Sequence, residues 1–359
     1  MIYLDYQATT PLAPEAREAM IKHLGGPDTT GFGNPHSPHR LGRQAAAAVE
    51  AAREKVAALL PDGGQVIFTG NACEALNLAI RGTPGEGAVA MSAIEHAAVY
   101  ETAPDAGESE VLSVDEKGLC DPAQNLPANA RMIAVMQVNN EIGTIQPVSQ
   151  WHRSAREMGA LMLVDAVQAY GKMPVADADL IAVSAHKIYG PKGIGALWVR
   201  DGVELTPQIT GGLQETFRSG TLSPALVAGF GAAAALAAER MDEDKAHAEA
   251  LWSRARDLFS DWTLNGSAEH RWHGNLNIRK DGIDVARLMS EVRGVMFSAG
   301  SACASGSGKP SHVLKAIGLT DAQAKSSIRI GFGRYTSQDD LEQAAQAINA
   351  AVKEQMQWG

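Results

Sequence analysis

The stretch DLIAVSAHKIYGPKGIGALWVR (residues 179–200) contains two apolar runs separated by basic residues and a glycine-rich turn. Both runs are short and apolar almost throughout, which predicts strands buried on both faces of a sheet. Lys187 follows the first run, so it is either a surface lysine on a turn or an amine held in a pocket for covalent chemistry. A second lysine, Lys192, lies between glycines and is expected to face solvent or to be structural.

Similar apolar runs occur earlier in the chain. They are VIFTG (66–70), GAVAMS (87–92), RMIAVMQV (131–138) and ALMLVDAV (160–167). Amphipathic segments such as CEALNLAIRG and SQWHRSAREMG separate several of the runs and predict helices. Buried strands that alternate with helices predict an α/β fold with a mainly parallel sheet covered on both faces.

The length of 359 residues suggests one large domain with a smaller companion. The run from Pro224 to Ala238 is rich in Gly and Ala and predicts a tightly packed helix, too short to span a bilayer. After about residue 245 the pattern changes to a charged helical stretch, followed by short strands and helices. We therefore predict a large domain over 12–245 and a small domain formed by 1–11 and 246–359.

The composition is ordinary for a globular protein, with 45% hydrophobic and 20% charged residues and a net charge of −10. This charge argues against binding to nucleic acid or to an anionic membrane. The N-terminus, MIYLDYQATT, lacks the basic and apolar regions of a signal peptide, which favours the cytoplasm. The odd number and wide spacing of Cys73, Cys120 and Cys303 fit neither a disulfide framework nor a zinc site, so each is a buried small side chain or a reactive thiol.

Polar side chains fall at the ends of several predicted strands, where ligands of such sheets bind. These residues are Asn139, Asn140, Asp165, His186 and Lys187. If Lys187 held an aldehyde cofactor through its amine, a carboxylate such as Asp165 would keep the cofactor's ring nitrogen protonated. Residues 70–74 join a predicted strand to a helix, whose first amides would be available to a phosphate group.

Eleven segments spread over nearly the whole chain carry a family resemblance. They are YLDYQATTPLAPEA (3–16), GNPHSPHRLGR (33–43), FTGNACEALNLAI (68–80), EH (95–96), VNNEIGTIQPV (138–148), VDAVQAYGK (164–172), SAHKIYGPKGIGAL (184–197), RSGT (218–221), SAGSACAS (298–305), PSHVLKAIGL (310–319) and SSIRIGFGRYT (326–336). In this order they resemble the cysteine desulfurases of the NifS/IscS type, in the class V aminotransferase group. The resemblance implies a pyridoxal 5'-phosphate enzyme of fold type I, an α/β fold with a mainly parallel seven-stranded sheet in a large domain and a smaller α/β domain.

The resemblance implies roles for five residues around the cofactor ring. Lys187 would bind the cofactor covalently and move the substrate's α-proton, and Asp165 would pair with the ring nitrogen. Gln168 would donate to the phenolic oxygen. His96 would stack on the ring and take part in proton transfer, and Asn140 would contact both cofactor and substrate.

The resemblance also places the cofactor phosphate. Ala72 and Cys73 would hold it at a helix start, together with Ser184 and His186. Thr221 would reach it from a second subunit, which implies a homodimer. The family usually has a threonine at position 73, and a thiol there is a weaker hydrogen-bond donor than a hydroxyl.

Arg329 and Cys303 complete the implied site. Arg329 corresponds to the residue that grips the substrate carboxylate, a task that suits guanidinium geometry. Cys303 lies among small residues, where a thiol can move, and would attack the sulfur of L-cysteine. L-Alanine would leave, and the persulfide on Cys303 would pass its sulfur to an iron–sulfur scaffold or another acceptor protein. No resident metal is expected, and whether Cys303 also ligates an iron–sulfur cluster transiently stays open.

Three functions compete at this point. A cysteine desulfurase would use the cofactor residues, the Arg329 clamp and the Cys303 thiol. Selenocysteine lyase, or another class V pyridoxal-phosphate enzyme, would share the cofactor site but would not need the Cys303 thiol. A non-catalytic sulfur carrier or scaffold partner would have no physical reason to keep the five residues Lys187, Asp165, His96, Arg329 and Cys303. The desulfurase is therefore the favoured interpretation.

Overall fold

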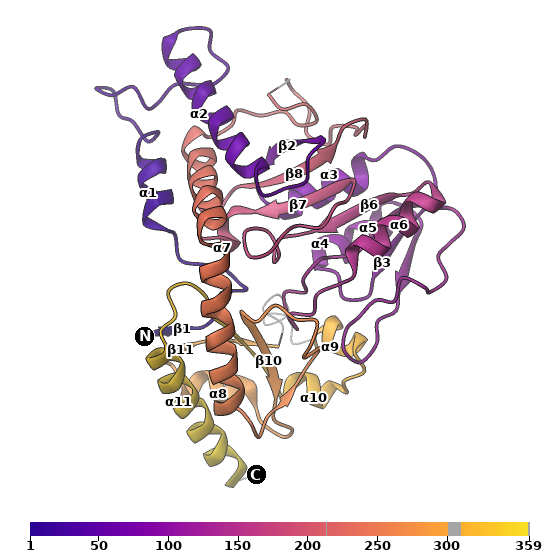
Figure 1. The fold of residues 1–359 in the computed structure, drawn as a ribbon, viewed down its shortest axis with the longest axis vertical. Coiled ribbons are helices and arrows are strands. Elements are labelled where there is room, and N and C mark those ends of the chain that lie inside the picture. The colour runs from indigo at the N-terminus through magenta and orange to yellow at the C-terminus, as the bar shows by residue number, and fades with distance from the viewer. Residues whose placement is uncertain (213, 301–309, 358–359) are drawn as a thin grey trace.

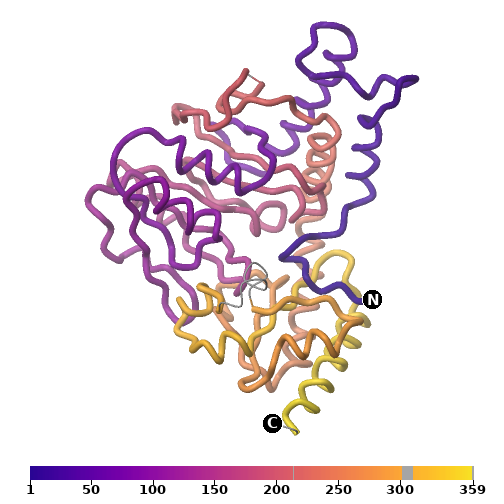
Figure 2. The backbone as a smooth tube through the Cα atoms, turned by 180° about the vertical axis from the view of Figure 1, so that it is seen from behind, coloured from indigo at the N-terminus to yellow at the C-terminus, as the bar shows by residue number. Residues whose placement is uncertain are grey.

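The computed structural model describes residues 1–212, 214–300 and 310–357 (Figure 1). A seven-stranded sheet lies in the upper part of Figure 1, and two smaller sheets lie in the lower part. One long helix, α7 (Pro224–Leu258), runs from the upper part into the lower. The N-terminal segment passes along the junction of the two parts, which is clearest from behind (Figure 2).

The large sheet has the strand order β2-β8-β7-β6-β5-β3-β4. Its strands are β2 (Gly64–Thr69), β3 (Ala88–Ser92), β4 (Ser109–Leu112), β5 (Ala130–Ala134), β6 (Leu161–Asp165), β7 (Leu180–Ser184) and β8 (Gly195–Arg200). Neighbours from β7 through to β4 are parallel, whereas β8 is antiparallel to both β7 and β2. The α/β fold with a mainly parallel seven-stranded sheet is therefore confirmed.

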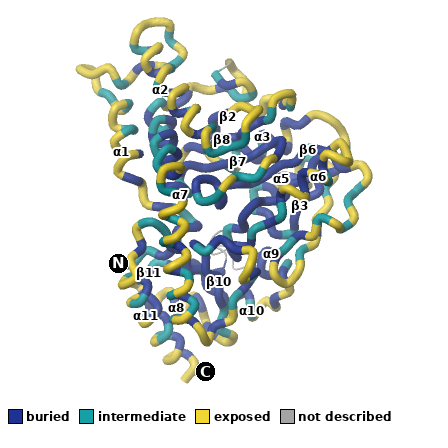
Figure 3. The backbone as a smooth tube through the Cα atoms, in the orientation of Figure 1, coloured by how far each residue is buried: buried dark blue, intermediate teal, exposed yellow. Residues whose placement is uncertain are grey.

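Helices cover both faces of this sheet because its strands are apolar on both sides. One face carries α2 (Arg40–Ala57), α6 (Val148–Met158) and α7, and the other carries α3 (Ala72–Gly82), α4 (Ala97–Tyr100) and α5 (Thr102–Ala106). In β7, Ile181 and Val183 belong to the first core, whereas Leu180 and Ala182 belong to the second. The central strands are accordingly buried, and exposure is concentrated on the outer helices and loops (Figure 3).

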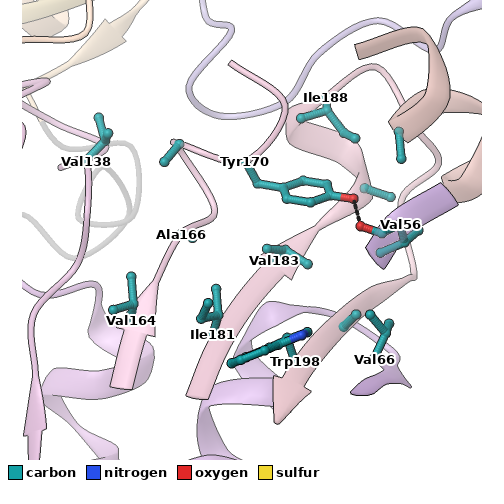
Figure 4. Packing of buried hydrophobic residues seen from close by; sticks show 14 of the residues in the cluster. Val56, Val66, Val138, Val164, Ala166, Tyr170, Ile181, Val183, Ile188 and Trp198 are labelled. Carbon is teal, nitrogen blue, oxygen red and sulfur yellow. Dashed lines mark hydrogen bonds between the residues drawn. The ribbon is translucent and has the colours of Figure 1, made fainter. Parts of the chain in front are cut away.

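Tyr170 shows how the first core accommodates a polar atom (Figure 4). Its ring is fully buried, and burial raises the pKa of its hydroxyl well above the ordinary value. That hydroxyl donates a hydrogen bond of 2.8 Å to the carbonyl oxygen of Val56, at the end of α2. The bond fixes α2 against the segment that follows β6.

Helix α7 is continuous where the sequence suggested two helical segments. Ser223 caps its start by accepting a hydrogen bond from the backbone N–H of Leu226. Its first half packs on α1 (Pro14–Ile21) and α2, and a Cβ at Gly231 would lie 2.6 Å from the Cβ of Ala52. Its last turns reach the core of the lower part. The boundary predicted at residue 245 lies inside this helix.

The lower part contains a four-stranded antiparallel sheet and a two-stranded parallel sheet. The strands are β9 (Thr263–Leu264), β10 (Asn275–Arg279), β12 (Ser298–Ala299) and β13 (Ser327–Gly331) in the first, and β1 (Ile2–Tyr3) and β11 (Val295–Met296) in the second. Its helices are α8 (Val285–Glu291), α9 (His312–Ala316), α10 (Asp321–Lys325) and α11 (Gln338–Gln357). None of the helices in the described ranges has both the length and the apolar character of a membrane span.

Candidate active site

A cavity of about 270 Å³ lies where β6 and β7 end, beside the start of α3 and the N-terminal segment. Its walls are formed by Gln7, Ala8, Asn71, Ala72, Cys73, Leu76, His96, Met136, Asn140, Asp165, Val167, Gln168, Ser184, His186, Lys187 and Arg329. The carboxyl ends of parallel strands are the expected ligand position in such a sheet. The cavity brings together ten residues that the sequence predicted for the site: Ala72, Cys73, His96, Asn140, Asp165, Gln168, Ser184, His186, Lys187 and Arg329.

Lys187 lines the cavity from a single 3-10 turn, η1 (Ala185–Lys187), that directly follows β7. Its amine donates to the backbone carbonyls of Gln7 (2.5 Å) and Ala8 (2.8 Å). The N-terminal segment therefore orients the Lys187 amine. Lys192, five residues later, is exposed.

Thr10 anchors this turn to the N-terminal segment. Its hydroxyl donates to the carbonyl of His186 (3.0 Å) and accepts from the backbone N–H of Tyr189 (2.7 Å). Tyr189 has a φ of 68°, a left-handed conformation that non-glycine residues rarely adopt. Gly195 then brings β8 close to α3, since a Cβ there would lie 2.8 Å from the backbone nitrogen of Ala72. The glycine-rich stretch thus folds the Lys187 turn against the start of α3.

Asp165 is the last residue of β6 and is buried at the cavity wall. Burial raises the pKa of Asp165, whereas the charge of His96, a hydrogen bond from the N–H of Val167 (2.9 Å) and the charge of Lys187 lower it. A cationic group placed against this carboxylate would favour its ionised form further. Asp165 is therefore suited to pair with a protonated ring nitrogen.

Gln168 is held from two sides. Its Nε2 donates to the carbonyl of Gln7 (3.0 Å), and its Oε1 accepts from the amine of Lys172 (2.9 Å). Burial and the charge of Lys187 lower the pKa of Lys172 to about 7. The Gln168 side chain therefore has a defined orientation at the cavity.

The start of α3 and the end of β7 form an anion-binding corner. Asn71 caps α3 by accepting from a backbone N–H three residues later (2.9 Å), so Ala72 and Cys73 occupy the first turn. Amides of a first helical turn have no acceptor within the helix, and the helix dipole favours an anion there. Ser184 adds a buried hydroxyl that has no hydrogen-bond partner among the described residues. This corner fits a phosphate group.

Two histidines reach the cavity with different environments. His96 caps α4, and its Nδ1 accepts from the N–H of Ala98 (3.1 Å), which puts the proton of the neutral ring on Nε2. His186 has its Nδ1 3.2 Å from the hydroxyl of Thr9. Burial, followed by the charge of Lys187, lowers the pKa of His186 to about 4, so this ring is neutral at pH 7.

Arg329 enters the cavity from β13 and is 1% exposed. Its Nη2 donates to the carboxylate of Asp5 (2.8 Å), and its Nη1 donates to the backbone carbonyl of Asn140 (3.1 Å). Its Nε is buried and has no partner within the described parts of the chain. The guanidinium therefore retains a donor for a carboxylate, although the protein's own Asp5 already contacts it.

Glu141 is a buried carboxyl next to this guanidinium that the sequence did not single out. It accepts from the hydroxyl of Ser311 (2.5 Å). Burial raises the pKa of Glu141 to about 7, and the Ser311 hydrogen bond and the charges of Arg329 and His96 limit this rise. Two carboxyl groups, Asp5 and Glu141, therefore interact with Arg329 at the arginine end of the cavity, although neither is among the described wall residues.

The residues present fit pyridoxal 5'-phosphate. Lys187 supplies an amine for the aldehyde, Asp165 a carboxylate for the ring nitrogen and Gln168 an amide for the phenolic oxygen. The unpartnered hydroxyl of Ser184, beside the first turn of α3, is an orphaned donor of the kind that a phosphate oxygen would satisfy.

The predictions for Thr221 and Cys303 are not tested by this cavity. Thr221 is exposed, just before α7, and does not line the cavity of its own chain; its contribution to a neighbouring subunit stays a prediction. Cys303 lies outside the described residues. The wall residues without a predicted role are Gln7, Ala8, Asn71, Leu76, Met136 and Val167. Gln7 lies in a segment that carried the resemblance, yet it follows no predicted strand of the large sheet, so no local signal marked it.

The chain matches the aminotransferase class-V family over residues 2–344. It is 40% identical over 376 residues to the mitochondrial cysteine desulfurase of Saccharomyces cerevisiae, an alignment that covers 98% of this chain and 75% of the yeast protein. It is also 40% identical to the cysteine desulfurase IscS of Neisseria meningitidis serogroup C over 381 residues, covering 98% of this chain and 92% of that one.

A comparison with solved structures agrees with these sequence matches. The crystal structure of a NifS-like protein from Rickettsia africae ESF-5 superposes with a TM-score of 0.89 at 27% identity, covering 98% of this chain and 99% of that chain. This likeness and the sequence matches confirm the predicted resemblance, and with it the pyridoxal-phosphate cofactor of the family. The chain belongs to the aminotransferase class-V family and, within it, to the cysteine desulfurases.

Proposed function

We propose that this chain converts L-cysteine to L-alanine and passes the sulfur to an acceptor, as a pyridoxal-phosphate-dependent cysteine desulfurase. The observation that carries the proposal is a single cavity shared by the amine of Lys187, the carboxylate of Asp165 and the guanidinium of Arg329. These three groups match the three needs of the reaction: a covalent anchor, a partner for the ring nitrogen and a clamp for the substrate carboxylate.

The chain's own residues hold the cofactor and move protons. When bound, pyridoxal 5'-phosphate supplies an aldehyde that condenses with amines and a ring that withdraws electrons from the substrate's α-carbon. Lys187 would hold the cofactor through its amine at the cavity wall, and the same amine, once the substrate's amine has replaced it on the cofactor, would take the α-proton. Asp165 keeps the ring nitrogen protonated. His96, with the proton of its neutral ring on Nε2, is placed to exchange protons with the substrate.

The substrate carboxylate binds at Arg329. The Nε of Arg329 has no partner in the described protein, and the Nη2 of Arg329 donates to Asp5. Asn140 lines the same wall, and its backbone carbonyl fixes the Nη1 side of the guanidinium. An amino acid whose carboxylate binds Arg329 would share a cavity of about 270 Å³ with the Lys187 amine.

The sulfur leaves through Cys303, whose role rests on its place in the SAGSACAS segment. Its thiolate would attack the substrate sulfur, and the bond from that sulfur to the substrate's β-carbon would break. The electron pair of that bond would stay with the β-carbon, which takes up a proton to give the methyl group of L-alanine, and Cys303 would become a persulfide. The persulfide then passes its sulfur to an iron–sulfur scaffold or another acceptor protein. The cytoplasmic location predicted from the sequence stays a prediction, which cell fractionation tests.

We also propose a homodimer. The exposed position of Thr221, away from its own cavity, supports a site completed by the partner subunit. Light scattering should give twice the chain mass of 37.8 kDa. Mixing Thr221→Ala with Lys187→Ala chains should produce dimers in which one site has both wild-type residues. Recovery of tight cofactor binding in that site supports the proposal, and a monomeric mass contradicts it.

The direct test measures alanine and sulfide produced from L-cysteine with a thiol reductant. Lys187→Ala should lose turnover together with the visible band of bound cofactor, whereas Cys303→Ser should lose turnover but keep the band. Lys192→Ala, on the exposed turn, is the matched control and should behave as wild type. If Cys303→Ser keeps full activity with L-cysteine, the persulfide route fails, and a selenocysteine lyase or another eliminating enzyme becomes the better account.

A further inference from the structure

Lys172 is a second amine close to Lys187, and the proposed reaction gives it no role. It follows Gly171, whose φ of 70° and tight packing define the turn: a Cβ there would lie 2.9 Å from Ile188 and 3.0 Å from Ala237. This turn leads the chain back toward Gln168, so that the Lys172 amine lies 2.9 Å from Gln168 Oε1. The contact joins Lys172 to the cavity wall through one side chain.

The two hydrogen bonds of Gln168 select the same orientation of its amide. Lys172 donates to Oε1, and the Gln7 carbonyl accepts from Nε2 at 3.0 Å. A reversed amide would turn its oxygen toward the Gln7 carbonyl, a contact between two acceptors that is repulsive at any pH, and its NH₂ toward the lysine amine, which is repulsive when Lys172 is protonated. In the observed orientation one Nε2 hydrogen binds Gln7, which leaves the other for a ligand in the cavity.

The charges around Lys172 come from several elements. Lys187 on η1 lies near enough to lower the pKa of Lys172. A small cavity of about 30 Å³ on its other side is lined by Tyr6, Tyr189, Asp244 and Arg334. Asp244 and Arg334 form an ion pair of 2.6 Å, so their charges largely offset each other. His186, also on η1, interacts electrostatically with Lys172 as well, whereas the contact of the Lys172 amine with Gln168 is a direct hydrogen bond.

We propose that Lys172 is a positioning residue: its amine holds the Gln168 amide so that Nε2 presents a hydrogen to the phenolic oxygen of the bound cofactor. The inference rests on the proposed function, because it needs the cofactor in the cavity. A donor at that oxygen stabilises its anionic form. It therefore lowers the proton affinity of the Lys187 nitrogen through which the cofactor is bound. Removing Lys172 should therefore raise the pH at which the visible band of the bound cofactor titrates.

The test is a pH titration of the visible spectrum of the cofactor-loaded protein, without substrate. Lys172→Met should raise the midpoint by about half to one pH unit, a threefold to tenfold change in proton affinity, the effect of about one hydrogen bond. Lys172→Arg, which keeps a cationic donor, should recover part of the shift. Lys192→Met removes a nearby positive charge that does not contact Gln168 and should leave the midpoint in place.

A double substitution separates positioning from direct charge effects. Gln168→Met should shift the midpoint in the same direction, and Lys172→Met added to it should shift it no further, because Lys172 acts through Gln168. Additive shifts, or an unchanged midpoint in a folded Lys172→Met protein, would overturn the inference. If Lys172→Met does not fold, the same comparison is made with Lys172→Arg alone and with Lys172→Arg combined with Gln168→Met. A wild-type protein with no visible band would instead count against the proposed function.

Discussion

The two ends of the cavity receive a ligand in opposite ways. At the helix end, by Ala72 and Cys73, the hydroxyl of Ser184 is buried without a partner among the described residues. At the arginine end, Arg329 already contacts the carboxylate of Asp5. The helix end therefore depends on its ligand to satisfy a polar atom, whereas the arginine end is part of the folded protein and must share its cation with the substrate.

The largest effect is expected from Arg329→Leu, which tests whether the arginine end supports the fold. Asp5 loses its cationic partner and the Asn140 carbonyl loses one donor, so the free energy of unfolding should fall by about 3 kcal/mol. The KM for L-cysteine should rise on the order of tenfold to 100-fold, as expected for charged hydrogen bonds. Urea unfolding without substrate and steady-state kinetics measure the two effects. Arg287→Leu, in an exposed pair with Glu291, is the control and should change stability by under about 1 kcal/mol.

If Arg329→Leu raised KM without loss of stability, the arginine end would behave like the helix end, and the comparison would fail.

Glu141 gives the arginine end a pH dependence of its own. The folded protein holds this proton up to a pKa of about 7, whereas the unfolded chain loses it near the ordinary value of 4.5. Glu141 therefore lowers the free energy of unfolding at neutral pH. Its contribution falls by about 3 kcal/mol as the pH rises from about 4.5 to about 7 and is constant above that range. Glu141→Gln should remove this slope.

Urea unfolding of wild type and Glu141→Gln across this pH range measures the difference. The exposed substitution Glu110→Gln serves as the control. If the free energies of unfolding of wild type and Glu141→Gln change with pH in parallel, Glu141 has the same pKa in the folded and unfolded protein, which contradicts the prediction.

Ser184→Ala tests the helix end. Because its hydroxyl has no protein partner in the described chain, the apoprotein should keep its stability within about 0.5 kcal/mol. The dissociation constant for pyridoxal 5'-phosphate should rise about threefold to tenfold, the value of one hydrogen bond. Ser298→Ala is the matched control at the arginine end, since that hydroxyl donates to Asp5 at 2.8 Å. It should lose about 1 kcal/mol of stability and leave cofactor affinity unchanged. Loss of stability in Ser184→Ala together with loss of cofactor affinity in Ser298→Ala would contradict this assignment of the two ends.

The sequence predicted the large sheet well because its central strands are apolar on both faces and are separated by helices. Strand β4 was missed: it is a four-residue edge strand with a single buried residue, Leu112, so it lacks the continuous apolar run. The continuity of α7 was also missed. The charged residues after Ala238 suggested a new segment, but no glycine or proline follows Gly231 within the helix, so nothing interrupts it.

The candidate site was predicted in two different ways. Strand-end position alone marked Asp165, His186 and Lys187, because the topology of a parallel sheet places such residues together. Only the resemblance marked Arg329, since it lies in the middle of a buried strand of another sheet. The carbonyls of Gln7 and Ala8 were not predictable from residue type, because every residue carries a backbone carbonyl and only the folded N-terminal segment brings these two to Lys187.

The smallest effect, and the sharpest test of the comparison, is expected from Asp5→Asn. The substitution keeps the volume and one oxygen acceptor for Arg329 but removes the negative charge that competes with the substrate carboxylate. Because Asp5 is partly exposed, the change in KM for L-cysteine should be modest, a decrease of about threefold. Asp5→Ala, which also removes the acceptor, should instead raise KM because the guanidinium loses its fixed orientation. If Asp5→Asn also raised KM, the charge of Asp5 would serve mainly to hold Arg329 in place. Competition between Asp5 and the substrate carboxylate would then not weaken substrate binding.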